Sequence, residues 1–289
     1  MKQSDRQALA IFPVVLLIGA LLALAGSSGG SLIGAIPTFT IAVAAAIAIQ
    51  WIVFIPSFIK QTEKFYDITG TLTYVSITVM ILLVTPELDA RSLILGALVL
   101  VWTLRLGIFL FRRINKAVKD DRFDALKPSF ARFLNVWTIQ GLWVTFTAAA
   151  AWVAMTSGNS VPLDGFALTG LIVWVLGIGM EIIADQQKSR FNANPANRGR
   201  FISTGLWSLS RHPNYFGEIL LWIGVGIIAF PALEGWQNIA LISPVFVILL
   251  LTKVSGVPLL EKKSDSKWGG QADYEAYKSK TPVLIPKFF

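Results

Sequence analysis

The sequence has no cysteine and only one histidine in 289 residues. The missing cysteine excludes disulfides, a thiol nucleophile, an iron–sulfur cluster and a cysteine-ligated zinc site. The single histidine also excludes histidine-rich metal centres, so no metal site is expected. Charged residues make up only 15% of the chain, against about 25% in an ordinary soluble domain. Any chemistry must therefore use carboxylates, tyrosine, asparagine, arginine or a bound organic cofactor.

Long apolar runs are what the sequence has in abundance, since 54% of its residues are hydrophobic. About 20 apolar residues are enough for a helix to cross a bilayer. The runs predict an all-α, polytopic transmembrane helix bundle of seven to eight spans, forming a single domain over residues 1–289. The predicted spans are 8–26, 36–59, 68–86, 92–112, 133–155, 164–185, 214–232 and 237–254. The first resembles a secretory signal ending near Ala23-Leu24-Ala25, but its length favours an uncleaved helix.

The basic residues predict the orientation of the bundle. The net charge is +8, and all but two of the 25 lysines and arginines fall in the two tails and alternate loops. The exceptions are Arg91, in a loop of the opposite set, and Arg105, inside the fourth predicted span. Because basic loops stay in the cytoplasm, both termini are expected there. The charge therefore reports topology, and no nucleic-acid partner is expected.

Several polar residues lie inside the predicted spans or at their cytoplasmic ends. An ionisable residue in a span is costly and indicates function, although an inter-helix salt bridge or a snorkelling end residue is the alternative. These residues are Glu63, Tyr66 and Asp67 after the second span, Arg105 in the fourth, Glu181, Asp185, Lys188 and Asn192 along the sixth, and Asn214, Tyr215 and Glu218 in the seventh.

The densest polar segment is Arg211-His212-Pro213-Asn214-Tyr215-Phe216-Gly217-Glu218. Pro213 suits the first position of a helix because it lacks an N–H group and has a fixed φ. Helix N-termini attract anions, so Arg211 and His212 form a candidate phosphate cradle. The alternative is an interfacial helix start that merely carries polar residues. His212 has no partner ligands for a metal, so it is expected to be a hydrogen-bonded residue.

This segment is similar to a known family. The pattern Arg200-x4-Gly205-Leu206-Trp207-x3-Arg211-His212-Pro213-Asn214-Tyr215-x2-Glu218 resembles the signature of bacterial membrane proteins related to steroid 5α-reductases. Thr62-Glu63-Lys64-Phe65-Tyr66-Asp67-x2-Gly70, Arg105-Leu106 and Tyr274-x2-Tyr277-x7-Ile285-Pro286 resemble the same family. The resemblance covers about residues 60–289, and residues 1–59 are additional N-terminal spans.

The resemblance implies a membrane-embedded reductase that uses NADPH to saturate the C=C bond of an α,β-unsaturated ketone, such as a 3-oxo-Δ4 steroid. By the same resemblance Asn214, Glu218 and Asp185 hold the nicotinamide and its ribose, and Arg200 and nearby basic residues hold the phosphates. Asn192 stands where relatives often carry an arginine. The expected cofactor-binding residues are Arg105, Asp185, Lys188, Asn192, Arg200, Arg211, His212, Asn214, Tyr215, Glu218, Asp265 and Tyr277.

The proton donor departs from the family pattern. The sequence has no Gln-Glu pair, and Trp102 stands at the position of the family's substrate-contacting tyrosine. A donor at the ketone oxygen lowers the barrier by about 3–4 kcal/mol if it resembles an oxyanion-hole donor. We expect Glu63 and Tyr66 in this role, with Asp67 orienting them.

Three further questions stay open at the level of sequence. The polar tail after Glu261 is either a solvated cytoplasmic tail or a cover for the adenosine end, with Asp265 and Tyr277 on the cofactor. The alternative enzyme is a membrane methyltransferase of the isoprenylcysteine carboxyl type, which shares an Arg-His-Pro-x-Tyr element and uses S-adenosylmethionine. A small-solute transporter is the non-enzymatic alternative, although transporter sites lie near the midplane. The expected partners are the lipid bilayer and an apolar enone, and a monomer is expected.

Overall fold

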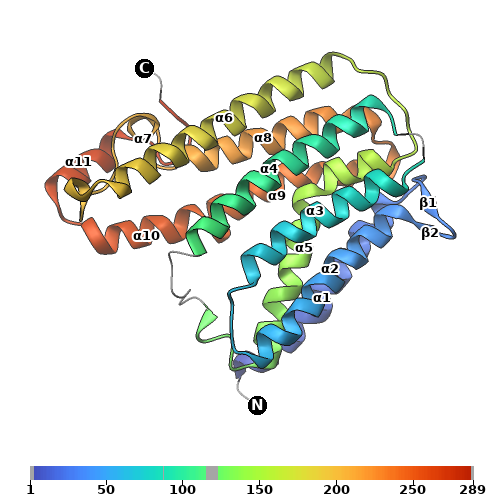
Figure 1. Cartoon of the computed structure of the whole chain (residues 1–289), viewed down its shortest axis with the longest axis horizontal. Coiled ribbons are helices and arrows are strands. Elements are labelled where there is room, and N and C mark those ends of the chain that lie inside the picture. The colour runs from blue at the N-terminus through green and yellow to red at the C-terminus, as the bar shows by residue number, and fades with distance from the viewer. Residues whose placement is uncertain (1–2, 87, 115–122, 288–289) are drawn as a thin grey trace. The chain divides into compact units, whose positions relative to one another are not determined.

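The computed structural model describes residues 3–86, 88–114 and 123–287 (Figure 1). The chain is almost entirely helical, and one short antiparallel hairpin, β1 (Leu32–Ile33) with β2 (Ile36–Pro37), is its sheet among these residues. The main helices are α1 (Gln3–Gly26), α2 (Thr38–Ile59), α3 (Tyr66–Val84), α4 (Ala90–Ile114), α5 (Phe130–Thr156), α6 (Gly165–Ala193), α7 (Leu206–Leu209), α8 (Pro213–Ala229), α9 (Ile242–Leu249), α10 (Val257–Trp268) and α11 (Ala272–Lys280).

The predicted transmembrane bundle is confirmed. Within the described residues, eight helical segments are long and apolar enough to cross a membrane. The exposed side chains of these segments include many leucines, isoleucines and valines, as expected for helices that face hydrocarbon. The chain is a multi-pass membrane protein by this criterion; the side on which its termini lie stays a prediction.

The chain divides into two compact units. The N-terminal unit comprises Met1–Phe166 and Ile228–Ser243, and the C-terminal unit comprises Ala167–Ile227 and Pro244–Phe289. The boundaries between the units fall inside α6, α8 and α9. The single domain over residues 1–289 stays a prediction.

Helix α5 is the centre of the N-terminal unit, where it packs against α1, α2, α3 and α4. The fully buried run Ala148–Ala151 gives it a narrow face at one end. Small residues allow helix backbones to approach closely, which is how membrane helices gain van der Waals contact. Towards the other end, Phe54, Phe123, Phe133 and Trp137 form an aromatic core.

Arg91, the basic residue outside the predicted set of loops, is buried at the start of α4. Its guanidinium donates to the carbonyl of Ile228 at 2.7 Å and to that of Pro162 at 2.7 Å. It also pairs with Asp164 at 2.9 Å. A cation near a helix C-terminus is favourable, and Ile228 lies in the last turn of α8. Arg91 therefore has a structural role.

Two glycines hold the C-terminal unit together where α6 and α8 cross. A Cβ at Gly177 would lie 2.5 Å from the amide nitrogen of Leu221, and one at Gly217 would lie 2.6 Å from the carbonyl oxygen of Gly177. Gly224, two turns further along α8, is equally tight against Gly170 of α6. Only glycine permits this approach, so these positions fix which side chains of α6 and α8 face each other.

Two predicted spans differ from the observed helices. The sixth was predicted to end at residue 185, but α6 continues to Ala193. Residues 186–193 are mostly polar, so the apolar run that defined the span ends before the helix does. The eighth was predicted as one helix over 237–254, but it runs as a 3₁₀ segment (Gly235–Leu241), then α9, then a π segment (Leu250–Val254). A π segment inserts an extra residue into a turn and often marks a functional position.

Candidate functional site

The start of α8 is the centre of the candidate site. Pro213 is its first helical residue, as predicted, and the amide of His212 donates to Ser210 Oγ at 3.1 Å. Asn214 lies in the first turn, where its Nδ2 donates to Asp185 Oδ1 of α6 at 3.3 Å. The Oδ1 of Asn214 is buried and accepts no hydrogen bond from the described residues. A buried acceptor without a donor is costly, so this atom is suited to an incoming N–H group.

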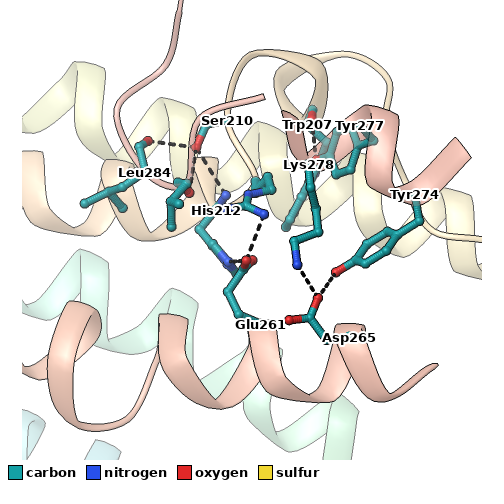
Figure 2. Close-up of polar contacts among 11 residues, drawn as sticks. Trp207, Ser210, His212, Glu261, Asp265, Tyr274, Tyr277, Lys278 and Leu284 are labelled. Atoms are coloured by element: carbon teal, nitrogen blue, oxygen red, sulfur yellow. Dashed lines mark hydrogen bonds and ion pairs between the residues drawn. The ribbon is translucent and has the colours of Figure 1, made fainter. Parts of the chain in front are cut away.

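A carboxylate holds the two basic residues that precede α8. Glu261 of α10 accepts from His212 Nε2 at 2.8 Å (Figure 2). It also pairs with Arg211 at 2.9 Å. The hydrogen-bonded reading of His212 is therefore confirmed. The other ring nitrogen, His212 Nδ1, and Arg211 Nε are buried without a hydrogen-bond partner among the described residues. The pair can still offer polar atoms to a ligand, but one carboxylate already offsets the charge of Arg211.

Tyr215 connects this corner to the π segment. Its ring stacks on His212 with centroids 5.7 Å apart and planes 9° from parallel. A Cβ at Gly256 would lie 2.9 Å from the Tyr215 ring and 2.7 Å from the carbonyl oxygen of Leu251. The wider turn before Gly256 thus brings the backbone against the tyrosine and fixes the His212–Tyr215 stack.

The polar end of α6 packs on α7. The Lys188 ammonium lies 4.5 Å from the Trp207 ring centroid, and Trp207 Nε1 donates to the carbonyl of Ala184 at 3.0 Å. Gln187 Oε1 accepts from the amide of Leu206 at 2.9 Å and so caps α7. Gly205 has φ +64°, and a Cβ there would meet the Gln187 amide at 2.6 Å. The Gly-Leu-Trp sequence therefore serves the packing of this turn against α6.

The tail is folded onto the same unit. Tyr277 Oη donates to the carbonyl of Trp207 at 2.7 Å. Asp265 accepts from Tyr274 Oη at 3.0 Å and from Lys278 Nζ at 2.6 Å (Figure 2). Burial, together with the hydrogen bond to Asp265, raises the pKa of Tyr274 to about 12. Burial also raises the pKa of Tyr277, and the hydrogen bond to Asp265 raises that of Lys278.

The remaining predicted cofactor residues are more dispersed. Asn192 on α6 and Arg200 before α7 are exposed, and Glu218 is half-buried on α8. All three belong to the C-terminal unit, whereas Arg105 lies on α4 in the N-terminal unit. A hydrogen bond joins Asp185 with Asn214, and Glu261 and ring stacking join Arg211, His212 and Tyr215 with one another.

The predicted proton donors lie in the N-terminal unit. Glu63 is buried, and its carboxylate accepts from Lys127 Nζ at 2.6 Å. This hydrogen bond raises the pKa of Lys127, and an adjacent ammonium favours the ionised form of Glu63. Tyr66 Oη donates to the carbonyl of Val136 at 3.4 Å.

Two kinds of residue in these sites were not predicted from the sequence. Glu261 and Lys127 are the ionic partners of predicted residues, but they lie 49 and 64 positions away in the chain. The glycines of the α6–α8 crossing were also missed. The seven-residue spacing of Gly217 and Gly224 was a usable signal, because it places two small residues on one helix face. No periodicity points to Glu261 or Lys127.

The orphaned atoms test whether a dinucleotide fits this corner. A carboxamide carries two N–H donors and one acceptor, which suits Asn214 Oδ1 as acceptor and Arg211 Nε as donor. The carboxylate of Glu261 would repel a phosphate placed directly beside it. The fit is therefore good for the amide end of such a ligand and weaker for phosphates at Arg211. Within the described residues, no group of carboxylates and histidine is arranged to hold a metal ion.

Comparison with known proteins gives one family match and two relatives. The profile of a family described as protein of unknown function (DUF1295) matches residues 53–281. An uncharacterized protein of Schizosaccharomyces pombe is 26% identical over 227 residues, which are 68% of this chain and 64% of that protein. A probable O-methyltransferase, ustE of Ustilaginoidea virens, is 32% identical over 68 residues, 24% of each chain. The aligned region is thus less than two thirds of either relative, and no solved structure matches the chain.

Proposed function

Because the chain belongs to the DUF1295 family, which includes steroid 5α-reductase-like proteins, we propose that it is a membrane-embedded, NADPH-dependent reductase. Its substrate is an apolar α,β-unsaturated ketone, such as a 3-oxo-Δ4 steroid, whose C=C bond is saturated. The observation that carries this proposal is the buried, unsatisfied Oδ1 of Asn214 beside Asp185, at the start of α8.

The proposed cofactor residues divide by chemistry. Asn214 would accept from the nicotinamide carboxamide, while Asp185 and Glu218 would take ribose hydroxyls. Basic residues outside the Glu261 pairings, Lys188 and Arg200, would hold phosphates. When bound, the nicotinamide supplies a hydride to the β-carbon of the enone.

The chain's own part in the reaction is to orient its ligands, exclude water and move a proton. As negative charge develops on the ketone oxygen, a nearby O–H donor stabilises it. Tyr66 is proposed as that donor. The ammonium of Lys127, which is bonded to Glu63, favours the ionised form of the Glu63 carboxyl. Glu63 and Asp67 would then orient Tyr66. The apolar spans admit a substrate that partitions into lipid, whereas the dinucleotide comes from water.

The proposed location is the cytoplasmic membrane, with the cofactor corner on the cytoplasmic side. The basic loops support this orientation. The two relatives come from fungi and give no support to a bacterial source. The bacterial inner membrane is therefore part of the proposal.

A second candidate function is methyl transfer. The match to a probable O-methyltransferase favours it, and that match covers 24% of this chain. A membrane methyltransferase also needs an adenosine cofactor from water and a lipid from the bilayer. The two candidates differ in the cofactor they consume and in the product they form.

The test is a reaction screen of the full chain in nanodiscs. NADPH and a panel of apolar enones are supplied, and consumption of NADPH is followed together with product mass. We expect enone-dependent NADPH oxidation with a product heavier by two hydrogens. Transfer of a methyl group from S-adenosylmethionine, with no enone-dependent NADPH oxidation, would reject the reductase in favour of the methyltransferase.

A further inference from the structure

A basic depression lies on the C-terminal unit, beside the corner that begins α8. Its volume is about 570 Å³. Four basic and two apolar side chains among those that line it carry the argument: Arg211, Lys278, Lys280, Lys287, Val283 and Ile285. No carboxylate is among its described lining residues.

The last segment of the chain, Thr281–Lys287, forms one wall of this depression and is called the strap here. The amide of Arg211 donates to the carbonyl of Pro282 at 2.9 Å, and the amide of Lys287 donates to that of Leu209 at 3.0 Å. The fully buried Ser210 donates its hydroxyl to the carbonyl of Leu284 at 2.7 Å (Figure 2). The strap is therefore fixed against residues 209–211.

These bonds set the level of the strap relative to a bilayer. α8 begins at Pro213, immediately after the residues that hold the strap, and the span it opens runs to Ala232. The first residues of a membrane-crossing helix lie where the hydrocarbon ends. The strap and the depression therefore lie at the level of the lipid headgroups.

The charge in the depression is only partly neutralised. Arg211 pairs with Glu261 at 2.9 Å and Lys278 with Asp265 at 2.6 Å. Lys280 and Lys287 are exposed and make no ion pair with any residue that the structure describes. Each such lysine close to an anionic lipid surface strengthens binding about fivefold.

Exposed apolar side chains separate the unpaired lysines. Ile285 is 70% exposed and Val283 is 38% exposed. Apolar side chains flanked by lysines are typical of surfaces that lie in the membrane interface. A soluble phosphate ester gains nothing from Ile285, whereas a phospholipid offers both a phosphate and acyl chains.

We propose that this depression binds the phosphate of an anionic phospholipid, with Lys280 and Lys287 on the headgroup and Ile285 at the acyl boundary. The proposal rests on the membrane-crossing helix α8 and does not depend on the proposed reductase activity. In this proposal the function of the strap is to form, together with the bound lipid, one continuous surface.

The test uses the full chain, delipidated in a neutral detergent, and measures binding of dioctanoyl phosphatidylglycerol and dioctanoyl phosphatidylcholine by native mass spectrometry. The variant Lys280→Gln/Lys287→Gln is compared with Lys262→Gln/Lys263→Gln, which removes two exposed lysines of α10 outside the depression. We expect phosphatidylglycerol to bind the first variant about 25-fold more weakly than wild type. We expect the second variant to match wild type.

Three results would overturn the proposal. One is equal phosphatidylglycerol affinity in wild type and Lys280→Gln/Lys287→Gln, and another is an equal loss in both double variants. The third is a loss of NADPH affinity in Lys280→Gln/Lys287→Gln with phosphatidylglycerol unchanged, which assigns the depression to a soluble phosphate. Ile285→Ser checks the apolar part: weaker binding of phosphatidylglycerol supports the proposal, and unchanged binding contradicts it. Unfolding temperatures without added lipid control for folding.

Discussion

At the scale of single residues, some polar side chains use their polar atoms in bonds within the protein, and others keep an atom that a ligand can bond. Glu261 and Asp265 each accept from two partners, which ties α10 to the start of α8 and to α11. Asn214 uses its amide nitrogen on Asp185 but leaves its oxygen buried without a donor. The chemistry proposed for this chain therefore depends on a side chain that is only half satisfied.

The buried pair Glu63–Lys127 should matter for stability. Lys127→Met leaves a buried carboxylate without its cation and is expected to lower the free energy of unfolding by about 3 kcal/mol. The double variant Glu63→Gln/Lys127→Met should recover most of this loss. Lys64→Met is the control, because Lys64 is exposed next to Glu63. Denaturant titration in detergent measures all three, and a loss in Lys127→Met no larger than in Lys64→Met would contradict the role given to the pair.

Tyr274 should make the tail fold sensitive to alkaline pH. Its pKa is raised from 10.0 to about 12 in the folded chain. A group with a raised pKa contributes its full stabilisation below the unfolded pKa. The stabilisation is therefore complete below pH 10 and is lost as the pH rises from 10 to 12. Lys278 acts in the same direction, since its pKa is also raised.

Ultraviolet absorbance of tyrosinate in wild type and Tyr274→Phe checks this prediction. The difference between the two proteins should titrate near pH 12, and the alkaline decline in stability should be smaller in Tyr274→Phe. A difference that titrates near pH 10, the ordinary value, would show that Tyr274 is neither buried nor bonded to Asp265 in solution.

At the scale of elements, the crossing of α6 and α8 positions the candidate site. Gly177→Ala places a methyl group against the α8 backbone, 2.5 Å from the Leu221 nitrogen, so the helices must separate. We expect a loss of about 1–3 kcal/mol in unfolding free energy and weaker NADPH binding. Gly179→Ala is the matched control on the same helix, because a Cβ there meets nothing within 4 Å. Equal stability and equal NADPH affinity in the two variants would contradict the role of the crossing.

The sequence predicted the existence of the helices better than their ends. A run of apolar residues long enough to cross a bilayer is a local property, so all the spans could be read directly. Hydropathy placed the end of the sixth span at residue 185, but α6 continues to Ala193, and Lys188 and Gln187 of this extension pack against α7. For the site, Pro213 at the helix start was predictable from its backbone chemistry. The pairing of His212 with Glu261 was not, because it joins residues 49 positions apart.

At the scale of the whole molecule, the basic loops predict that both termini lie in the cytoplasm. The chain has no cysteine, so single cysteines report on their own position. Gln3→Cys, Ser160→Cys and Ser266→Cys are exposed test positions. In intact cells, a membrane-impermeant maleimide should label only Ser160→Cys, which follows α5. Labelling of Gln3→Cys or Ser266→Cys from outside would contradict the orientation.

The most direct test of the central claim is the affinity of the detergent-purified chain for NADPH, measured by nucleotide fluorescence. Wild type should bind saturably, and Asn214→Ala should bind about tenfold more weakly, as expected when one buried hydrogen bond is lost. Asn238→Ala, at an exposed asparagine in the segment Gly235–Leu241, should bind as wild type does. Absence of saturable NADPH binding by wild type, or unchanged affinity in Asn214→Ala, would contradict the account.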